Sequence, residues 1–399
     1  MRPKNAHLVV LVAAVAVAAV AIGGVLAHRQ GPRADGNAAT PLPAPSTTAT
    51  APVAKTSTPV AKTPSSTPPK NPTATPSVTP RGPAFSGPVK VDFKLSKLPR
   101  GRSPQMPYLV GREVRGGAGQ PITIPGSAYV QEISRLGDQV FAIVTKGEGT
   151  ELLKVGYPGA PVRTPDVTSV VTTDDETAAA YAASRRGSGG GAVQGGTVYA
   201  QTAADTQVHK LSLPKAWDIR VLGYTNGQVY FRWSDSDGAT SWRLSTWTPG
   251  SSEVTLIKTV PSPTALTSDG RIAASRNISQ DFGSCSNLTE IATGKRLWRT
   301  CENQVVAFTP DGTIAVGAPA SQDGYADLQA SALDAKTGAL LREWTGPAFK
   351  KTVAEDDQHF LIQADDGPET KAAIVRCTVT TGACELAVPP TTGQVLLGR

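Results

Sequence analysis

The chain has 399 residues, with 39 Lys and Arg against 32 Asp and Glu, a formal charge of +7. The charge is unevenly distributed: residues 1–106 hold 13 basic and 2 acidic residues, whereas the rest hold 26 and 30. Because a nucleic-acid-binding domain carries its own basic patch, this distribution argues against nucleic acid as a partner.

The N-terminus predicts export. Arg2 and Lys4 precede an uncharged apolar run, residues 8–27, whose 20 residues can span a bilayer as a helix. A cleaved signal peptide is the alternative, because Val25-Leu26-Ala27 suits signal peptidase. We expect residues 1–7 in the cytoplasm and a single-pass protein with an extracytoplasmic C-terminal domain, or else a secreted one. The membrane is then a partner through the N-terminal helix.

Residues 28–88 read as a disordered linker. Between Gly31 and Pro80 there are 12 prolines, 16 serines and threonines and no aromatic residue. Such a segment cannot bury enough apolar surface to offset the entropy of ordering it. The folded domain is therefore expected at residues 89–399.

A period of 44 residues organises this domain. Glycines of tight turns follow one another at that interval, and the series extends backwards at intervals of 45, 46 and 40. The seven positions are Gly119, Gly159, Asp205, Gly250, Gly294, Gly338 and Gly382. A second set of polar turns lies halfway between them, which gives four strands per period. The pattern predicts an all-β fold, a seven-bladed β-propeller with six blades as the alternative.

The clearest unit is 303–347, with strands expected at 304–308, 313–318, 328–333 and 339–344. Pro347 lies where one unit should pass to the next. The seventh unit must be assembled from both ends of the domain, from a hairpin of 108–114 with 121–125, a strand at 89–95 and a strand at 394–398. Pairing these segments would close the ring.

Thr309-Pro310-Asp311-Gly312 and Leu333-Asp334-Ala335-Lys336-Thr337-Gly338 resemble turns of the WD40, TolB-like and YVTN propeller superfamily. The resemblance covers roughly residues 89–399 and implies the fold, but no activity. No unit carries the Gly-His and Trp-Asp signature of WD40 proteins.

The four cysteines form two close pairs. Cys377 and Cys384 face each other across the turn at Gly382, which predicts a disulfide, with free thiols as the alternative. Cys285 would oppose Thr300, one residue short of Cys301, so a second disulfide requires a β-bulge. No histidine lies near either pair, which argues against zinc.

The tryptophans pose a choice between sugar binding and packing. Trp242 and Trp247 lie an odd number of residues apart, so at least one should pack between sheets. Trp298 and Trp344 lie 46 residues apart and predict a repeated packing role.

The sequence shows no catalytic motif. Gly-x-Ser-x-Gly, His-Glu-x-x-His and a phosphate loop are missing, and the domain holds only His209 and His359, on an outer and a second strand. The glycine-rich run 187–196 is expected to be a mobile loop, which could cover the mouth of the central channel. No cofactor and no metal are indicated.

Acidic loops between second and third strands are the most suggestive functional feature. They recur about one unit apart and should lie on one face, with Glu148 and Glu151 extending the rim and Arg185 and Arg186 interrupting it. Such carboxylates could bind a cation or a basic partner, although turns also require these residues. The candidate ligand-binding residues are Asp235, Asp237, Asp281, Asp323, Asp327, Asp365, Asp366, Arg185 and Arg186.

We therefore expect a monomeric, non-catalytic domain for binding, sensing or scaffolding, with a cell-wall or extracellular protein or a small ligand as partner. The alternatives are a secreted propeller enzyme, either lactonase-like or resembling a quinone-dependent dehydrogenase, and a structural envelope component. An enzyme would require carboxylates, Asn or His that converge at the channel.

Overall fold

The computed structural model describes residues 84–156, 159–187, 190–205, 207–279, 283–321, 325–367 and 370–398. The expected anchor and the linker up to residue 83 lie outside this range. Within it, no helix is both long and apolar enough to cross a membrane.

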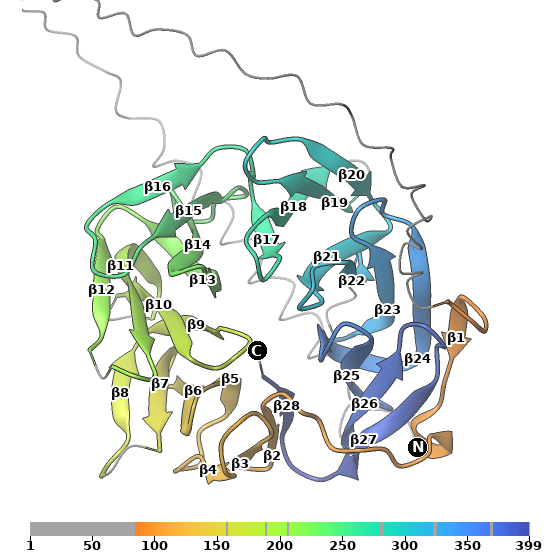
Figure 1. The fold of residues 1–399 in the computed structure, drawn as a ribbon. Helices are drawn as coiled ribbons and strands as arrows, with labels where there is room; N and C mark the ends of the chain where they lie inside the picture. The colour runs from red at the N-terminus through yellow and green to blue at the C-terminus, as the bar shows by residue number, and fades with distance from the viewer. Residues whose placement is uncertain are drawn as a thin grey trace, which may run out of the picture. The chain divides into compact units, whose positions relative to one another are not determined.

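The described part is built from antiparallel sheets of four strands, like propeller blades, arranged around a common axis (Figure 1). In hydrogen-bonded order the first three sheets are β28 (Val395–Leu397), β2 (Tyr108–Val110), β3 (Glu113–Arg115), β4 (Ile122–Thr123); β5 (Val130–Leu136), β6 (Gln139–Lys146), β7 (Gly149–Val155), β8 (Val162–Pro165); and β9 (Val167–Thr172), β10 (Ala178–Arg186), β11 (Ala192–Thr202), β12 (His209–Leu213).

Two further four-stranded sheets follow the same order. They are β13 (Trp217–Thr225), β14 (Gln228–Ser234), β15 (Arg243–Trp247), β16 (Val254–Ile257); and β17 (Pro263–Leu266), β18 (Ile272–Ser279), β19 (Gly283–Glu290), β20 (Arg296–Thr300).

The last sheet has eight strands: two groups of four that share one long strand account for seven, and β1 is the eighth. They are β21 (Asn303–Phe308), β22 (Ile314–Pro319), β23 (Asp327–Asp334), β24 (Leu340–Ala354), β25 (His359–Asp365), β26 (Ala372–Thr378), β27 (Cys384–Thr391) and β1 (Lys90–Asp92). The first half of β24 pairs with β23, and from Ala348 onward it pairs with β25. The change of partner falls at Pro347, the position expected from the sequence.

The closure of the ring was only partly predicted. The strand β28 does pair with β2, so the C-terminus completes the sheet begun near the N-terminus. The strand expected at 89–95 does not join this sheet: β1 pairs parallel with β24 instead. The reason is that the segment 108–114 turns at Gly111, whose φ is 63°, and supplies both β2 and β3. With β4 and β28 the sheet already has four strands.

Apolar residues on both sides of the strands form cores between neighbouring sheets. One such core joins β9–β12 to β13–β16 through Ala180, Ala182, Phe231 and Trp247, all buried. Small residues on β10 allow the sheets to approach closely, and the large rings of the next sheet fill the space. Trp247 is thus the packing tryptophan that the sequence predicted.

The halfway turns share one hydrogen-bond pattern, which explains why Thr-x-Asp recurs. Thr267 Oγ1 donates to Asp269 Oδ1 at 2.6 Å, and Thr309 Oγ1 donates to Asp311 Oδ1 at 2.7 Å. The carboxylates also accept backbone N–H groups two residues on. These side chains therefore hold the turns that place β17 beside β18 and β21 beside β22.

Both disulfides are present. Cys377 and Cys384 are direct cross-strand partners. The pairing of Cys285 with Cys301 uses a bulge between Leu288 and Thr289, which shifts Thr300 opposite Ser286. Disulfides of this kind indicate an oxidising, extracytoplasmic environment.

Gly338, one of the glycines of the 44-residue period, is required by a neighbouring sheet as well as by its turn. Gly338 has a φ of 76°, and a Cβ there would lie 2.8 Å from the Trp298 ring. Trp298 Nε1 donates to Ala335 O at 2.8 Å, and Trp344 Nε1 donates to Gly382 O at 3.1 Å. Each tryptophan thus contacts the turn of the following group of four strands, which is the repeated packing role that was expected.

We expect Gly338→Ala to lower the free energy of unfolding by about 3 kcal/mol, because it combines left-handed backbone strain with a clash against a packed indole. Gly227→Ala is the matched control, since Gly227 has a φ of 71° but no atom near its missing Cβ. It should cost only about 1 kcal/mol. Urea denaturation measures both, and equal losses would show that the indole contact is unimportant.

Candidate functional site

A pocket of about 290 Å³ lies between the sheets β9–β12 and β13–β16. It combines cationic, acidic, hydroxyl and aromatic side chains within a small volume. Its lining consists of Thr168, Ser184, Arg185, Arg186, Ala192, Val193, Trp217, Asp218, Arg220, Ser234, Ser236, Asp237, Gly238, Ala239 and Trp242.

One wall comes from the end of β10. The buried run Ala178–Ala183 leads to Arg185 and Arg186, both exposed. The register between β10 and β11 shifts between Ser184 and Arg186, so these arginines leave the regular alternation of the strand. Arg186 Nη1 donates to Gly190 O at 2.8 Å, which ties its guanidinium to the following hairpin.

The opposite wall is organised around Asp218 on β13. Trp242 Nε1 donates to Asp218 Oδ2 at 2.7 Å, and Arg220 Nε lies 3.4 Å from Asp218 Oδ1. The guanidinium of Arg232 lies over the Trp242 ring at 4.8 Å and 3.8 Å from Asp218 Oδ2. The carboxylate of Asp218 therefore serves to fix the indole and the two arginines.

Hydroxyl groups join the two sheets beneath the pocket. Ser184 Oγ accepts the N–H of Ile219 at 3.0 Å, and Thr168 Oγ1 donates to Ile219 O at 2.7 Å. Asp218 has a φ of 42°, and Asp166 and Ser262, before the first strands of their own sheets, have φ values of 59° and 48°. A residue with positive φ thus recurs at the start of three sheets. The conformation of Asp218 is therefore a feature of the repeated fold and not of the pocket alone.

Among the candidate ligand-binding residues, the pocket brings together Arg185, Arg186 and Asp237. Asp235 is close in sequence but forms an ion pair with Arg243. Asp281 and Asp323 lie outside the described residues. The sequence suggested an acidic rim that Arg185 and Arg186 interrupt. At this pocket, acidic and basic side chains instead line the same cavity.

The other candidates lie elsewhere. Asp365 is buried at the end of β25, where it accepts hydrogen bonds from Tyr325 Oη at 3.1 Å and from Gly367 N at 3.0 Å. Asp366 is exposed, and Asp327 begins β23. The bonds of Asp365 within the protein point to a structural role.

Glu151 does not extend an acidic rim. It is buried on β7 and paired with Lys146 and Arg163, each at 2.5 Å. These two cations lower the pKa of Glu151 against the opposing effect of burial, which is the largest single influence. Glu148 remains exposed.

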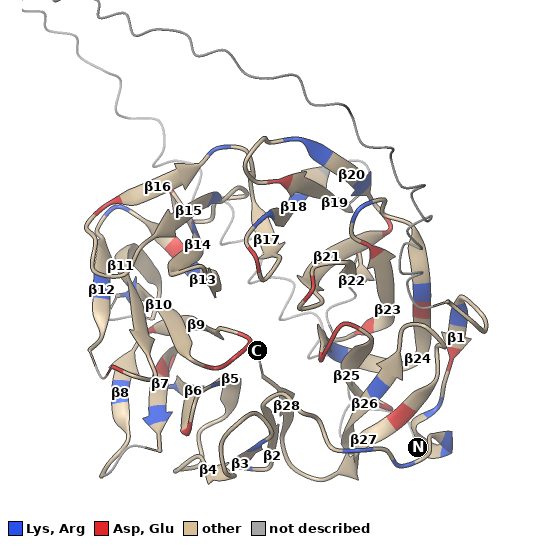
Figure 2. Ribbon diagram, in the orientation of Figure 1, with Lys and Arg blue, Asp and Glu red and all other residues tan. Residues whose placement is uncertain are grey.

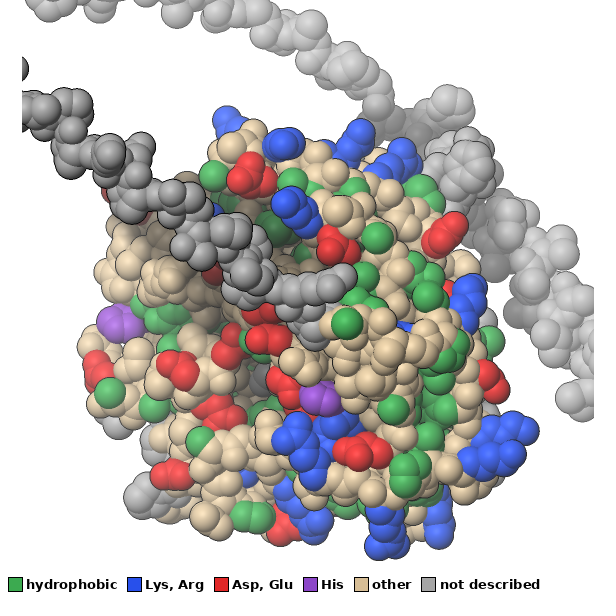
Figure 3. All heavy atoms as spheres, turned by 45° about the vertical axis from the view of Figure 1, so that its right-hand side comes forward, with side chains coloured by type: hydrophobic (Ala, Val, Ile, Leu, Met, Phe, Trp, Pro, Cys, Tyr) green, Lys and Arg blue, Asp and Glu red, His purple; other side chains and the backbone are tan. Residues whose placement is uncertain are grey.

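Acidic residues do gather on another set of loops, the halfway turns near the middle of the ring (Figure 2). In the space-filling view, red side chains lie beside a hollow (Figure 3). Desolvation, followed by the negative charges of Asp175 and Asp357, raises the pKa of Asp174, which nevertheless keeps solvent contact. Asp174 and Asp357 come from different sheets, so these turns converge.

Sequence reasoning assigned these aspartates to turn formation. Asp311 N also donates to Asp357 Oδ1 at 2.8 Å, a bond between neighbouring turns. No group of three or more metal-ligating side chains with suitable geometry occurs among the residues that the structure describes.

The glycine-rich run 187–196 is not a long loop over the channel. Gly196 pairs with Ser184 and Ala192 pairs with Arg186, so much of the run is the start of β11. Gly187 N donates to Gly191 O at 2.9 Å across the hairpin end. The expectation of a loop over the whole run was therefore wrong for residues 192–196, where strand pairing satisfies backbone groups that a loop would expose.

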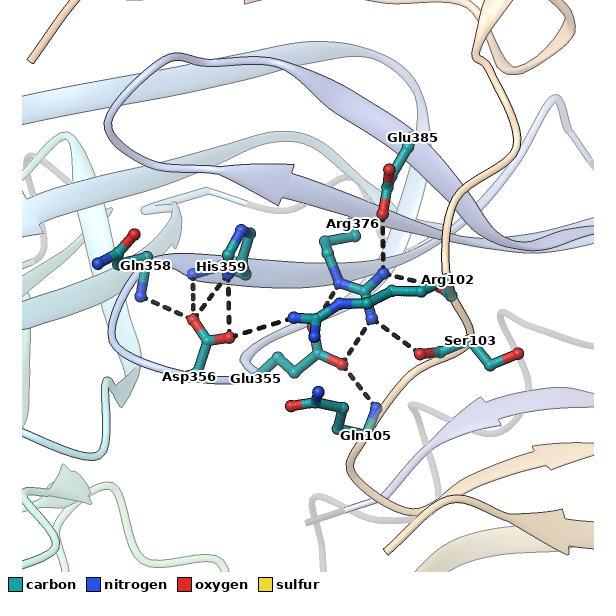
Figure 4. Close-up of polar contacts among 9 residues, drawn as sticks. All are labelled: Arg102, Ser103, Gln105, Glu355, Asp356, Gln358, His359, Arg376 and Glu385. Carbon is teal, nitrogen blue, oxygen red and sulfur yellow. Dashed lines mark hydrogen bonds and ion pairs between the residues drawn. The ribbon is translucent and has the colours of Figure 1, made fainter.

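A second polar cluster surrounds Arg376 and holds the segment 84–107, here named the N-terminal strap (Figure 4). The guanidinium of Arg376 donates to the carbonyls of Arg102 and Ser103 at 2.7 and 3.0 Å. It also pairs with Glu355 at 2.5 Å and with Glu385 at 2.9 Å. The side chains of Arg376 and Glu355 are only 3% and 0% exposed, which makes this a buried ion pair.

His359 lies at the edge of the same cluster, where its Nδ1 is 2.9 Å from both carboxylate oxygens of Asp356 (Figure 4). Asp356 also accepts the backbone N–H groups of Gln358 and His359, and it lies 3.6 Å from Arg102. The histidine is thus bound into a turn beside the strap.

Comparisons with known proteins give only remote likenesses. No protein-family model matches the chain, and no curated protein matches it. Solved structures that resemble it include TolB from Acinetobacter baumannii, at 14% identity over 63% of this chain and 69% of that one with a TM-score of 0.38. Another is the WD40 domain of Toxoplasma gondii coronin, at 9% identity over 64% and 69% with a TM-score of 0.42.

A puromycin hydrolase is similar at 15% identity over 78% of this chain and 57% of that one, with a TM-score of 0.48. The chain therefore matches little more than half of that enzyme. A TolB protein and a WD40 domain are thus among the proteins to which the chain is similar. At such identities and TM-scores they carry no argument about activity.

We expect Arg376→Met to lower the free energy of unfolding by about 3–5 kcal/mol, because it leaves Glu355 buried without its cation. The double variant Glu355→Met with Arg376→Met should recover most of this loss. Urea denaturation and limited proteolysis of the strap measure the effect. A single variant as stable as the wild type would mean that the strap is held by other contacts.

Lys154 is the second buried cation with a testable consequence. Its Nζ donates to Gln201 Oε1 and lies 4.7 Å from the centre of the Tyr181 ring, across the boundary between two sheets. Burial, and then repulsion from Lys210, lowers the pKa of Lys154 to about 8. In the unfolded chain this pKa returns to about 10.4.

Between these values the unfolded chain binds more protons than the folded one, so the free energy of unfolding should rise as pH rises from about 8 to about 10.4. The rise attributable to Lys154 is about 3 kcal/mol. Lys154→Met should remove it, whereas exposed Lys215→Met should not. Denaturation at several pH values measures this rise. An unchanged pH dependence in Lys154→Met would show that the rise does not come from Lys154.

Proposed function

We propose that the chain is a seven-bladed propeller, displayed outside the cytoplasm by its N-terminal segment, that binds a ligand in the pocket beside Arg185 and Arg186 without converting it. We further propose that it acts as a monomer. The pocket is the observation that carries the proposal, because it gathers three of the residues that the sequence singled out.

The period supports seven blades. Division of the eight-stranded sheet at Pro347 leaves seven groups of four strands. The seven turns of the period, from Gly119 to Gly382, each fall between the third and fourth strands of one group. The pairing of β28 with β2 joins the two ends of the series.

Display outside the cytoplasm is supported by two independent features. Both disulfides belong to an oxidising environment. The apolar run at 8–27 and the proline-rich linker supply an export signal and a spacer. The strap then connects this spacer to the outer edge of β24.

A binding role is favoured over catalysis by the commitments of the pocket's polar groups. Ser184 and Ser234 bond to backbone atoms, and Asp218 is held by Trp242 and Arg220. The lining contains no histidine, cysteine or lysine that could act as nucleophile or base. Fixed donors and aromatic surface suit recognition.

The proposal predicts that at least one member of a panel of sugars, amino acids, nucleosides and organic acids raises the melting temperature of the full-length protein. Ala239→Trp, which fills the pocket, should abolish this shift. Tyr129→Ala is the control, since Tyr129 lies directly before β5 in another sheet and is 63% exposed. Mass spectrometry should recover the ligand unchanged.

Two results would count against this function. A shift that persists in Ala239→Trp would place binding elsewhere, and consumption of the ligand would favour the enzymatic alternative. A panel in which no compound shifts the wild type would remove the support for small-molecule binding.

A further inference from the structure

The charges of the pocket do not cancel. Its lining holds Arg185, Arg186 and Arg220 against Asp218 and Asp237. Arg220 is matched by Asp218, which also accepts the Trp242 N–H and lies 3.8 Å from Arg232. What remains is the pair Arg185 and Arg186 with Asp237.

Within the described residues, neither Arg185 nor Arg186 forms an ion pair. Most other arginines near this region do: Arg163, Arg220, Arg232 and Arg243 each have a carboxylate partner. Two guanidinium groups without a carboxylate partner leave this end of the pocket positively charged, and an anion bound there would be attracted to both. Arginine also recognises carboxylates and phosphates through paired hydrogen bonds.

Beside the arginines the pocket offers apolar surface. Ala192, Val193 and Ala239 line it together with the half-buried Trp217 and Trp242. The Trp242 N–H is already occupied by Asp218, so the ligand would contact these residues through carbon rather than through hydrogen bonds to the indole. The volume of about 290 Å³ is near the lower end for small-molecule sites, about 300–1,000 Å³.

We propose that this pocket binds a small organic anion, in which one carboxylate or phosphate group lies at the end of the pocket that Arg185 and Arg186 line and a ring packs against Trp217 and Trp242. The inference rests on the proposed function and names the chemistry of its ligand. It reverses the expectation that acidic loops on this face attract a cation.

The test compares three sugars that share a ring and differ in charge: glucuronate, glucose 6-phosphate and neutral glucose. Isothermal titration with the full-length protein should show that at least one anionic sugar binds at least tenfold more tightly than glucose. The difference between the two anions tells a carboxylate ligand from a phosphate ligand. Raised salt should weaken the anions and leave glucose unaffected.

Variants make the test specific. Arg185→Gln with Arg186→Gln should weaken the anionic sugar at least tenfold, the loss expected when charge-assisted hydrogen bonds are removed. Arg243→Gln is the matched control, because Arg243 is paired with Asp235 outside the lining. Asp237→Asn should strengthen anion binding severalfold, whereas a cationic ligand would bind more weakly.

Three outcomes would overturn the inference: equal binding of glucose and both anions, unchanged binding in the double glutamine variant, or no binding of either anion. The proposed function fails separately. If a neutral compound binds and Ala239→Trp blocks it while the arginine variants do not, the pocket is a binding site and only its charge preference was wrong.

Discussion

The ring depends on buried cationic side chains that donate to backbone carbonyls of a neighbouring element. Arg135 on β5 donates to Gln120 O at 2.7 Å and to Val114 O at 3.2 Å in the sheet that closes the ring. Arg342 on β24 donates to Val379 O at 3.0 Å and to Ser86 O at 2.9 Å. A planar guanidinium can donate to more than one carbonyl of a neighbouring element at once.

Contacts of the same kind, from buried arginines to backbone carbonyls, also attach the strap. Outer strands leave a row of unpaired backbone groups, which β1 covers on β24 over only three residues. So short a pairing is weak alone, and Arg342 and Arg376 supplement it by binding the carbonyls at Ser86, Arg102 and Ser103. The strap is therefore attached both by strand pairing and by two buried guanidinium groups.

The sequence predicted features that depend on neighbouring residues and missed contacts between distant segments. Turn glycines, the Thr-x-Asp turns, Pro347 and both disulfides follow from local backbone geometry, which is written in a few adjacent residues. The destination of 89–95 was wrong, because strand pairing between distant segments leaves no local pattern. The hydrogen bond between Asp218 and Trp242 could not be predicted either, since 24 residues separate them along the chain and β14 lies between their strands.

In a propeller, a binding site should be sought where side chains are not used by the repeat. Regular units place the same turn residues around the ring, so most of their carboxylates are used in holding the turns, as Asp269 and Asp311 are. A ligand site needs side chains that the repeat does not use. Arg185 and Arg186 stand where the glycine-rich insertion lengthens β11, and Asp237 belongs to the next sheet. For the two arginines it is the departure from the period, rather than the period itself, that supplies the unused charges.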